Sequence, residues 1–260
     1  MNRSFSKSAR DATRRGPRAA PGRLAAIADA AARVFTRQGF RLSPVADVAR
    51  EAGVAAGTVY LYATDKAALL DLAIRAAAGL RLPQDGDGPV QPDLAATLAE
   101  ALGPRLALPR IEAAAAGDGG EAVTPRALLA DLYDLMTREA RLILLLDRLG
   151  AEVPEIRDAY TAGLRDRALA DFTAAVARLA GTGVVRPDLD PSMMARAVLE
   201  MMAWMAMRRP GDAAPPAGDE TLARETTLRL AEAALGAPQP ATSLAAAGPA
   251  ARIQNVRAGR

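Results

Sequence analysis

Residues 43–66 constrain the fold of this 260-residue chain more than any other stretch, and they read SPVADVAREAGVAAGTVYLYATDK. Ser43 can cap a helix with its hydroxyl, and Pro44 then stands at the first helical position, where a missing N–H costs nothing. Gly53 can adopt the positive φ that ends this helix. A second short helix follows, with the polar side chains Thr58, Tyr60 and Tyr62. The pattern predicts a helix-turn-helix, whose second helix enters a DNA major groove.

Helices on both sides of this stretch are expected to supply its core. Apolar residues three or four apart predict a helix over residues 23–38 that ends at Gly39; they are Leu24, Ile27, Ala31, Val34 and Phe35. After Lys66 a second stripe predicts a helix capped by Thr64 or Asp65; it consists of Leu69, Ala73, Ile74 and Ala77. This helix would link the DNA-binding module to the rest of the chain.

At these residues the chain resembles the TetR family of bacterial transcriptional repressors. The matching pattern runs from Gly39 to Lys66 as GF-x-x-S-P-V-x-D-V-A-x-x-A-G-V-x-x-G-T-V-Y-x-Y-x-x-x-K, and the resemblance covers residues 23–80. Two positions depart from the family, since Ala55 replaces the Ser that usually caps the recognition helix and Ala63 replaces a Phe. The resemblance implies DNA contacts from Ser43, Thr58, Tyr60, Tyr62 and Lys66.

Helical spacing assigns faces to the recognition helix. Thr58 and Tyr62 lie four positions apart and share the groove-facing side, whereas Tyr60 points away from them. Val59 and Ala63 share the opposite side and are expected in the core. The alternative is that both tyrosines are merely packing aromatics.

Direct reading of bases by this helix is limited, because no Arg, Lys, Asn or Gln lies between Ala55 and Ala63. Ala55 and Ala56 can contact thymine methyl groups, and Gly57 lets the backbone approach DNA closely. Much of the affinity is then expected from cations that contact phosphates, namely Arg37, Arg41, Arg50, Lys66 and those of the N-terminal arm.

Positive charge is concentrated at the N-terminus. Residues 1–80 hold 13 Lys and Arg against 6 Asp and Glu, whereas residues 81–260 hold 20 against 24. Residues 1–22, with Arg14, Arg15 and Arg18, are expected to form a disordered basic arm. The arm is either a solvated tail or a segment that reaches DNA phosphates or the minor groove. A transit peptide is disfavoured because no amphipathic helix results.

The rest of the chain is expected to be helical. Residues 81–92, RLPQDGDGPVQP, predict a boundary between a DNA-binding domain at 23–80 and a helical domain at 81–236, which the resemblance makes a domain for effector binding and dimerisation. Helices are predicted to start near Pro125 and Pro154, at Pro191 after a cap by Asp190, and after a cap by Asp219. No stretch shows the alternation of a strand, so the expected fold class is all-α, with a disordered tail at 237–260.

The predicted helix at residues 191–209 carries two adjacent apolar stripes, more than the single stripe of a surface helix. A second buried side indicates a dimer interface, which the resemblance also implies; a core helix in a monomer is the alternative. The interface candidates are Met194, Val198, Met201, Met202 and Met205, with Leu222 and Leu230 of the last helix.

Candidates for a ligand pocket are Tyr133, Met136, Glu139, Tyr160, Arg165 and Trp204. Glu139 and Arg165 lie in or beside apolar stripes, and a buried charge needs a partner. These two could meet a ligand or each other, or face water at a helix kink, which is possible near residues 138–141. Core packing explains the other four equally well.

The chain has no Cys and no His. Thiol catalysis and Cys/His zinc sites are therefore excluded, and no glycine-rich phosphate loop is present. We therefore expect that the protein is not an enzyme and binds no cofactor and no metal. No apolar run is long enough for a membrane span, and a cytoplasmic location is expected. We therefore interpret the chain as a homodimeric repressor that binds a double-stranded DNA operator and leaves it when a small-molecule effector binds. The alternatives are an activator, a ligand-independent regulator, or a helical interaction protein with a vestigial DNA module.

Deletion of residues 1–18 removes six positive charges and one negative charge. If the arm contacts phosphates, the deletion lowers the slope of log affinity against log salt concentration, by about 0.9 for each phosphate that the arm neutralises. Fluorescence anisotropy with a labelled DNA duplex at several salt concentrations measures this slope. Identical slopes for the two proteins would show that the arm is a spectator.

Overall fold

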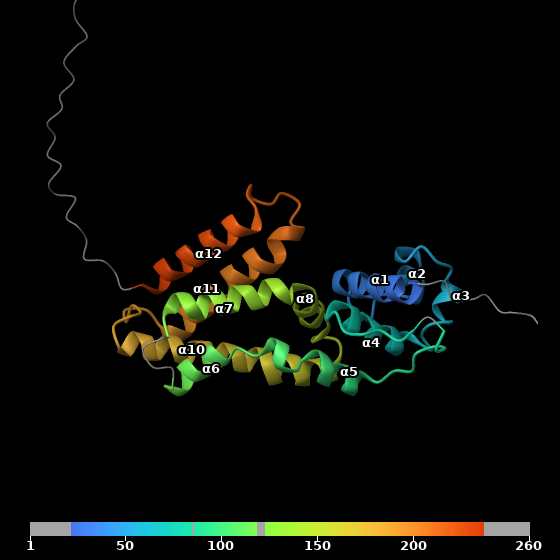
Figure 1. Cartoon of the computed structure of the whole chain (residues 1–260), viewed down its shortest axis with the longest axis horizontal. Helices are drawn as coiled ribbons and strands as arrows, with labels where there is room; N and C mark the ends of the chain where they lie inside the picture. Colours follow the sequence, from blue (N-terminus) through green and yellow to red (C-terminus); the bar gives the residue numbers. More distant parts are fainter. Residues whose placement is uncertain (1–21, 85, 119–122, 237–260) are drawn as a thin grey trace, which may run out of the picture. The chain divides into compact units, whose positions relative to one another are not determined.

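The computed structural model describes residues 22–84, 86–118 and 123–236. Every secondary-structure element within these residues is a helix, which confirms the all-α fold class (Figure 1). The helices form two compact units. Unit 1 contains the described residues of Met1–Ala107 and Leu135–Arg167, and unit 2 those of Leu108–Asp134 and Ala168–Arg260. Most of the expected arm, with its three named arginines, and the expected tail lie outside the described residues.

Unit 1 is built on the first four helices of the chain. They are α1 (Arg23–Gln38), α2 (Val45–Glu51), α3 (Ala56–Val59) and α4 (Lys66–Ala77). α1 packs against α2 and α4. As predicted, Gly39 ends α1 with a φ of 83°, and its N–H donates to the Phe35 carbonyl at 2.9 Å. Asp65 caps α4 as one of the two predicted caps, because its carboxylate accepts the free N–H of Ala68 at 2.8 Å.

Helices from later in the chain complete the core of unit 1. α5 (Leu94–Ala101) packs on α4, and α8 (Ala140–Leu149) packs on both α1 and α4. Every residue from Ala68 to Ile74 is buried, so α4 needs neighbours on all sides. The boundary predicted at residues 81–92 therefore does not coincide with the division between the two units. The remaining short helices of unit 1 are η1 (Pro104–Leu106), α9 (Pro154–Ile156) and the π-helix η3 (Arg157–Arg165).

A helix break occurs within residues 138–141, where the sequence allows a kink. α7 (Pro125–Arg138) ends one residue before Glu139, which has φ −103° and ψ 15°, and α8 starts at Ala140. Glu139 is nevertheless only 4% exposed. The expectation that it faces water is therefore wrong.

Unit 2 holds most of α7 and the C-terminal helices. These are α6 (Pro109–Ala116), α10 (Asp166–Gly181, which starts in unit 1), α11 (Pro191–Ala203), η4 (Trp204–Arg208), η5 (Arg209–Gly211) and α12 (Glu220–Leu235). Asp190 caps α11 and Asp219 caps α12, as predicted, through bonds of 2.9 Å and 2.8 Å from backbone N–H groups. In the described part of the chain, no helix has the length and apolarity that crossing a membrane requires.

The burial of α11, which packs on α12, corrects the predicted dimer face. Met194, Val198 and Met202 are 6%, 3% and 0% exposed in the single chain, so they are core residues and not an open surface. The sequence pattern misplaced them, because a helix buried within its own unit shows the same wide apolar surface as a helix at an interface. Met201 and Met205 are half-buried, whereas Leu222 and Leu230 are 56% and 55% exposed.

Two methionines of α11 test this assignment. Met202→Ala removes a fully buried side chain and is expected to lower the free energy of unfolding by about 2–5 kcal/mol. Met193→Ala, at a position that is 71% exposed, is the matched control and should change it by less than about 0.5 kcal/mol. Urea denaturation measures both; equal effects would contradict the burial of Met202.

Candidate nucleic-acid interface

α2 and α3 form the predicted helix-turn-helix. Gly53 adopts a φ of 67°, and the N–H of Val54 donates to the Ala49 carbonyl at 2.9 Å, so the chain turns sharply between the helices. Ala55 precedes α3 in an extended conformation and supplies no side-chain cap. α3 is only four residues long, and its orientation depends on the helices around it.

Ser43 has a different role from the predicted one. Pro44 occupies the N-cap position of α2, and no side chain caps this helix. The Ser43 hydroxyl is buried and donates to the Gly39 carbonyl at 2.6 Å. It therefore ties the turn after α1 together, and the interpretation of Ser43 as a helix cap is wrong, whereas its contact with DNA stays a prediction.

The recognition element consists of α3 and the tight turn that follows it, residues 56–63. Tyr62 is 4% exposed and lies on the buried side of this element. The chain tightens after α3, since the N–H of Leu61 donates to Thr58 O at 3.1 Å and that of Tyr62 to Val59 O at 2.9 Å. With three residues per turn, positions i and i+3 eclipse, so Tyr62 follows the buried Val59. The prediction that Tyr62 shares the groove-facing side of Thr58 is therefore wrong, whereas the burial of Val59 and Ala63 is confirmed.

The same tightening places an unpredicted residue on the open side. Leu61 is 48% exposed and Tyr60 is 50% exposed, while Thr58 is half-buried. Leu61 eclipses Thr58 and can add an apolar contact to a thymine methyl. The rest of this open face consists of Ala55, Ala56 and Gly57. Sequence reasoning missed Leu61 because it assumed 3.6 residues per turn throughout.

Acidic neighbours neutralise several cations of the folded part. Glu51 accepts hydrogen bonds of 2.7 Å from Arg37 and from Arg33, and these bonds lower the pKa of Glu51 to about 2. Arg50 forms an ion pair of 2.9 Å with Asp47, although its side chain is 74% exposed. Arg37 and Arg50 would therefore exchange existing partners for phosphates.

Arg41 and Lys66 lie together beside the helix-turn-helix. The backbone N–H of Arg41 donates to Glu152 Oε2 at 2.7 Å, and Lys66 Nζ donates to the Arg41 carbonyl at 3.3 Å. Lys66 Nζ also lies 4.7 Å from the centre of the Phe40 ring. Burial lowers the pKa of Lys66, against the opposing effect of the Glu152 charge. Arg41 is exposed, whereas Lys66 is half-buried.

The folded part of the DNA-binding module carries little net charge. Residues 22–80 hold 7 Lys and Arg against 5 Asp and Glu, an excess of two, whereas residues 1–21 hold 6 against 1, an excess of five. Most of the positive charge that a polyanion would attract therefore precedes Gly22.

The segment between α4 and α5 is bonded to the end of the recognition element. Val90 N donates to the Tyr62 carbonyl at 2.8 Å, and Thr64 N donates to the Val90 carbonyl at 3.1 Å. The Thr64 hydroxyl bonds to the same carbonyl at 3.1 Å. Ala63 and Val90 form an isolated parallel β-bridge. A movement of this segment would therefore displace or strain the backbone at residues 62–64, which follow α3.

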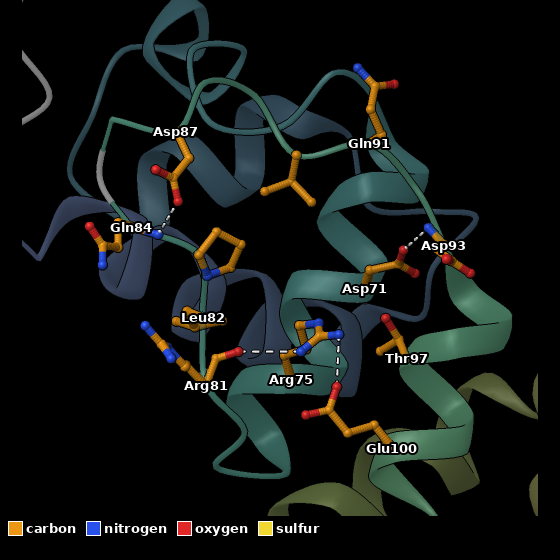
Figure 2. Close-up of a pocket in the computed structure, with 12 residues that line it drawn as sticks. Asp71, Arg75, Arg81, Leu82, Gln84, Asp87, Gln91, Asp93, Thr97 and Glu100 are labelled. Atoms are coloured by element: carbon orange, nitrogen blue, oxygen red, sulfur yellow. Dashed lines mark hydrogen bonds and ion pairs between the residues drawn. The ribbon is translucent and has the colours of Figure 1, made fainter.

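A cavity of about 600 Å³, with both polar and apolar lining residues, lies between this segment, α4 and α5 in unit 1 (Figure 2). Asp71 of α4 is 2% exposed and lines the cavity. Asp71 Oδ2 accepts the N–H of Asp93, whereas Oδ1 is buried without a hydrogen-bond partner among the described residues. An unpaired buried acceptor costs about 1–3 kcal/mol. Sequence reasoning missed the site, although Asp71 interrupts an apolar run.

Burial raises the pKa of Asp71, although the hydrogen bond from Asp93 opposes this effect. The folded protein therefore retains the Asp71 proton to higher pH than the unfolded chain does. The contribution of Asp71 to stability consequently falls as pH rises from the ordinary carboxyl range through its raised pKa.

Four of the predicted ligand-pocket residues lie in unit 1, and three of these, Glu139, Tyr160 and Arg165, already have protein partners. Glu139 forms ion pairs of 3.1 Å with both Arg105 and Arg138. Tyr160 donates a hydrogen bond of 3.1 Å to Asp147. Burial and the Asp147 charge raise the pKa of the Tyr160 hydroxyl.

Arg165 also bonds to Asp147 Oδ1, at 3.1 Å, so Glu139 and Arg165 do not pair with each other. Met136 is buried at 8% exposure. In unit 2, Tyr133 donates to Glu220 at 2.7 Å and Trp204 is half-buried. The six candidates are thus divided between the two units, and none of them lines the cavity at Asp71.

The two tyrosines of the recognition element provide a matched test. Tyr60→Ala should weaken binding to an operator by about 1–3 kcal/mol if its ring and hydroxyl contact DNA, with little change in stability. Tyr62→Ala should instead lower the free energy of unfolding by several kcal/mol, because it empties a buried site. Anisotropy and urea denaturation separate the two effects; a reversed pattern would contradict the assigned faces.

Comparison with known proteins relates the residues around this interface to a family of regulatory proteins. Residues 27–73 match the family model described as "Bacterial regulatory proteins, tetR family". A search of curated proteins gave no match. Solved structures similar to this chain include the ketosteroid regulator KstR2 of Mycobacterium tuberculosis, with 16% identity over 83% of this chain and 96% of that chain and a TM-score of 0.48.

Two further similar structures have comparable scores. PfmR, a TetR-family regulator from Thermus thermophilus, has 20% identity over 82% of this chain and 96% of that chain, with a TM-score of 0.48. AibR, solved with isovaleryl coenzyme A and operator DNA, has 18% identity over 84% of this chain and 100% of that chain, with a TM-score of 0.49.

The matched residues include most of α1, the whole helix-turn-helix and most of α4. The structure shows the same elements, with α3 presented on an open side. The match confirms the resemblance found in the sequence. This chain therefore carries the N-terminal DNA-binding domain of the TetR family of bacterial regulatory proteins.

Proposed function

We propose that this chain is a transcriptional repressor that binds an operator as a homodimer and is released by a small-molecule effector. The observation that carries the proposal is the helix-turn-helix within residues 27–73, which match the family. Its second helix presents a small-residue face, Ala55 to Gly57, that allows close approach to a DNA groove. Because the proposed partner is DNA, we expect the protein to act in the cytoplasm.

The exposed side of α12 supports dimerisation. Leu222, Thr226 and Leu230 are spaced four apart and are all exposed, so they form one stripe along the helix. Burying apolar surface contributes about 25 cal/mol per Å², and a two-fold axis lets the same stripe serve both copies. The half-buried Met201 and Met205 of α11 remain candidates for the edge of this interface.

No catalytic role is proposed. The chain lacks His and Cys, the residues that most often act as general base and nucleophile at neutral pH. An activator or a ligand-independent regulator would use the same DNA-binding face. A helical interaction protein with a vestigial DNA module would not select a DNA sequence, which makes DNA selection the decisive experiment.

Selection of duplexes from a random pool by the full-length protein should enrich a near-palindrome. Its half-site centres should lie one helical turn, about 34–36 Å, or a multiple of this apart, because a two-fold dimer presents two recognition helices. Footprinting the selected duplex then defines the operator. Failure to enrich any sequence would contradict the proposal and favour the interaction protein.

The double variant Leu222→Glu/Leu230→Glu tests the dimer on the same duplex. It places like charges near the two-fold axis, so sedimentation should show a monomer and operator affinity should fall. Thr221→Glu, exposed on α12 outside the stripe, is the matched control and should remain dimeric. A wild-type protein that is monomeric at micromolar concentration, yet binds the operator tightly, would refute dimerisation.

A further inference from the structure

We propose that the cavity at Asp71 is an effector site for a small organic cation, whose N–H groups bind the Asp71 carboxylate, and that occupancy reaches the recognition helix through Val90. The inference rests on the proposed function, since it names a class of effector and the site where it acts. Figure 2 shows Asp71 on α4 facing the segment between α4 and α5.

The charges around the cavity favour a cation. Four carboxylates line it, those of Asp71, Asp87, Asp93 and Glu100, against the two guanidinium groups of Arg75 and Arg81. Arg75 is already engaged, because it forms an ion pair of 2.9 Å with Glu100 and donates to the Arg81 carbonyl at 3.3 Å. An anion would therefore meet an excess of negative charge.

Hydrogen bonding narrows the ligand class. Asp87 accepts the N–H of Gln84 at 2.9 Å, and Asp93 caps α5 through Ala96 N at 3.1 Å. Asp71 Oδ1, in contrast, is a buried acceptor without a partner among the described residues. A ligand with a hydrogen-bond donor can satisfy this oxygen, and a positively charged N–H group forms the stronger bond with a carboxylate.

A metal ion and a purely polar ligand fit less well. In the described part of the chain, no three carboxylates are arranged to hold a metal ion. The cavity also has an apolar side, formed by Leu82, Pro83 and Val90. A cation with an ammonium head and a short apolar body would contact both sides, with its head at Asp71.

Three hydrogen bonds of Val90, which lines the cavity, connect it to residues 62–64 after α3. The segment from Arg81 to Asp93 is bonded to Arg75 at its start and to Asp71 at its end. Between these points Val90 is bonded to the backbone on both sides of Ala63, directly after α3. A ligand that moves Asp71 or the segment therefore strains the bonds that hold the end of the recognition element. A ligand that prefers the shifted arrangement then lowers the affinity for DNA.

Hexylammonium and hexyltrimethylammonium are matched probes, because they share the charge and the chain but only the first has N–H donors. In calorimetry with the full-length protein, hexylammonium should bind at least about tenfold more tightly than the trimethyl analogue. Asp71→Asn should remove this preference. Asp118→Asn, which makes the same charge change on an exposed loop of unit 2, should retain it.

Regulation is measured with the selected duplex at constant ionic strength. Saturating hexylammonium should lower the operator affinity of the wild-type protein at least about fivefold, and should not affect that of Asp71→Asn. The trimethyl analogue controls for the general effect of salt on DNA binding.

Equal binding of the two probes by the wild-type protein, or binding that persists in Asp71→Asn, would overturn the site. Tight binding of hexylammonium without any change in operator affinity would overturn its regulatory role. Calorimetry needs no DNA, so a failure of the proposed function, seen as no selected duplex, remains distinguishable from a failure of the site. The probe comparison uses wild-type protein alone, so it stands even if Asp71→Asn does not fold.

Discussion

The packing of α1 against α4 forms the framework that holds the helix-turn-helix of unit 1 in position. Both helices contribute alanines to this core, including Ala28 and Ala31 of α1 and Ala73 of α4, which are fully buried. Small side chains let two helices approach closely, and with only 3% aromatic residues the chain relies on aliphatic packing. α3 contributes one buried residue, Val59, so its four residues hold their orientation only because this framework is rigid.

Local chemistry made several helix ends in both units predictable. Asp65, Asp190 and Asp219 cap helices as their sequence context predicts, because capping needs only the next three residues. Gly39 and Gly53 take positive φ for the same local reason. The helix-turn-helix was recognisable because its turn residues and the apolar stripes of the neighbouring helices indicate the same arrangement of helices.

Faces and burial were less predictable because they depend on distant segments. Tyr62 turned inward when the chain changed from 3.6 to about three residues per turn, a change that spacing alone does not reveal. Met202 lies in a core whose other half, α12, comes later in the sequence. Asp71 meets Asp93 across 22 positions, so its unpaired oxygen could not be inferred from neighbouring residues.

The clamp between the turn after α1 and the end of α8 has a consequence for protein engineering. Arg41 N bonds to Glu152, and Arg148 donates to the Gln38 carbonyl at 2.9 Å, so residues 38–41 are fixed by a segment more than 100 positions away. A Cβ at Gly39 would lie 2.1 Å from Glu152 Oε1, so any larger residue there would displace the Glu152 and Arg148 side chains that form this clamp. A chimera that joins residues 1–80 to a foreign effector domain would lack this clamp, along with α5 and α8. The transferable part of this regulator is therefore the whole of unit 1, assembled from two separate stretches of sequence.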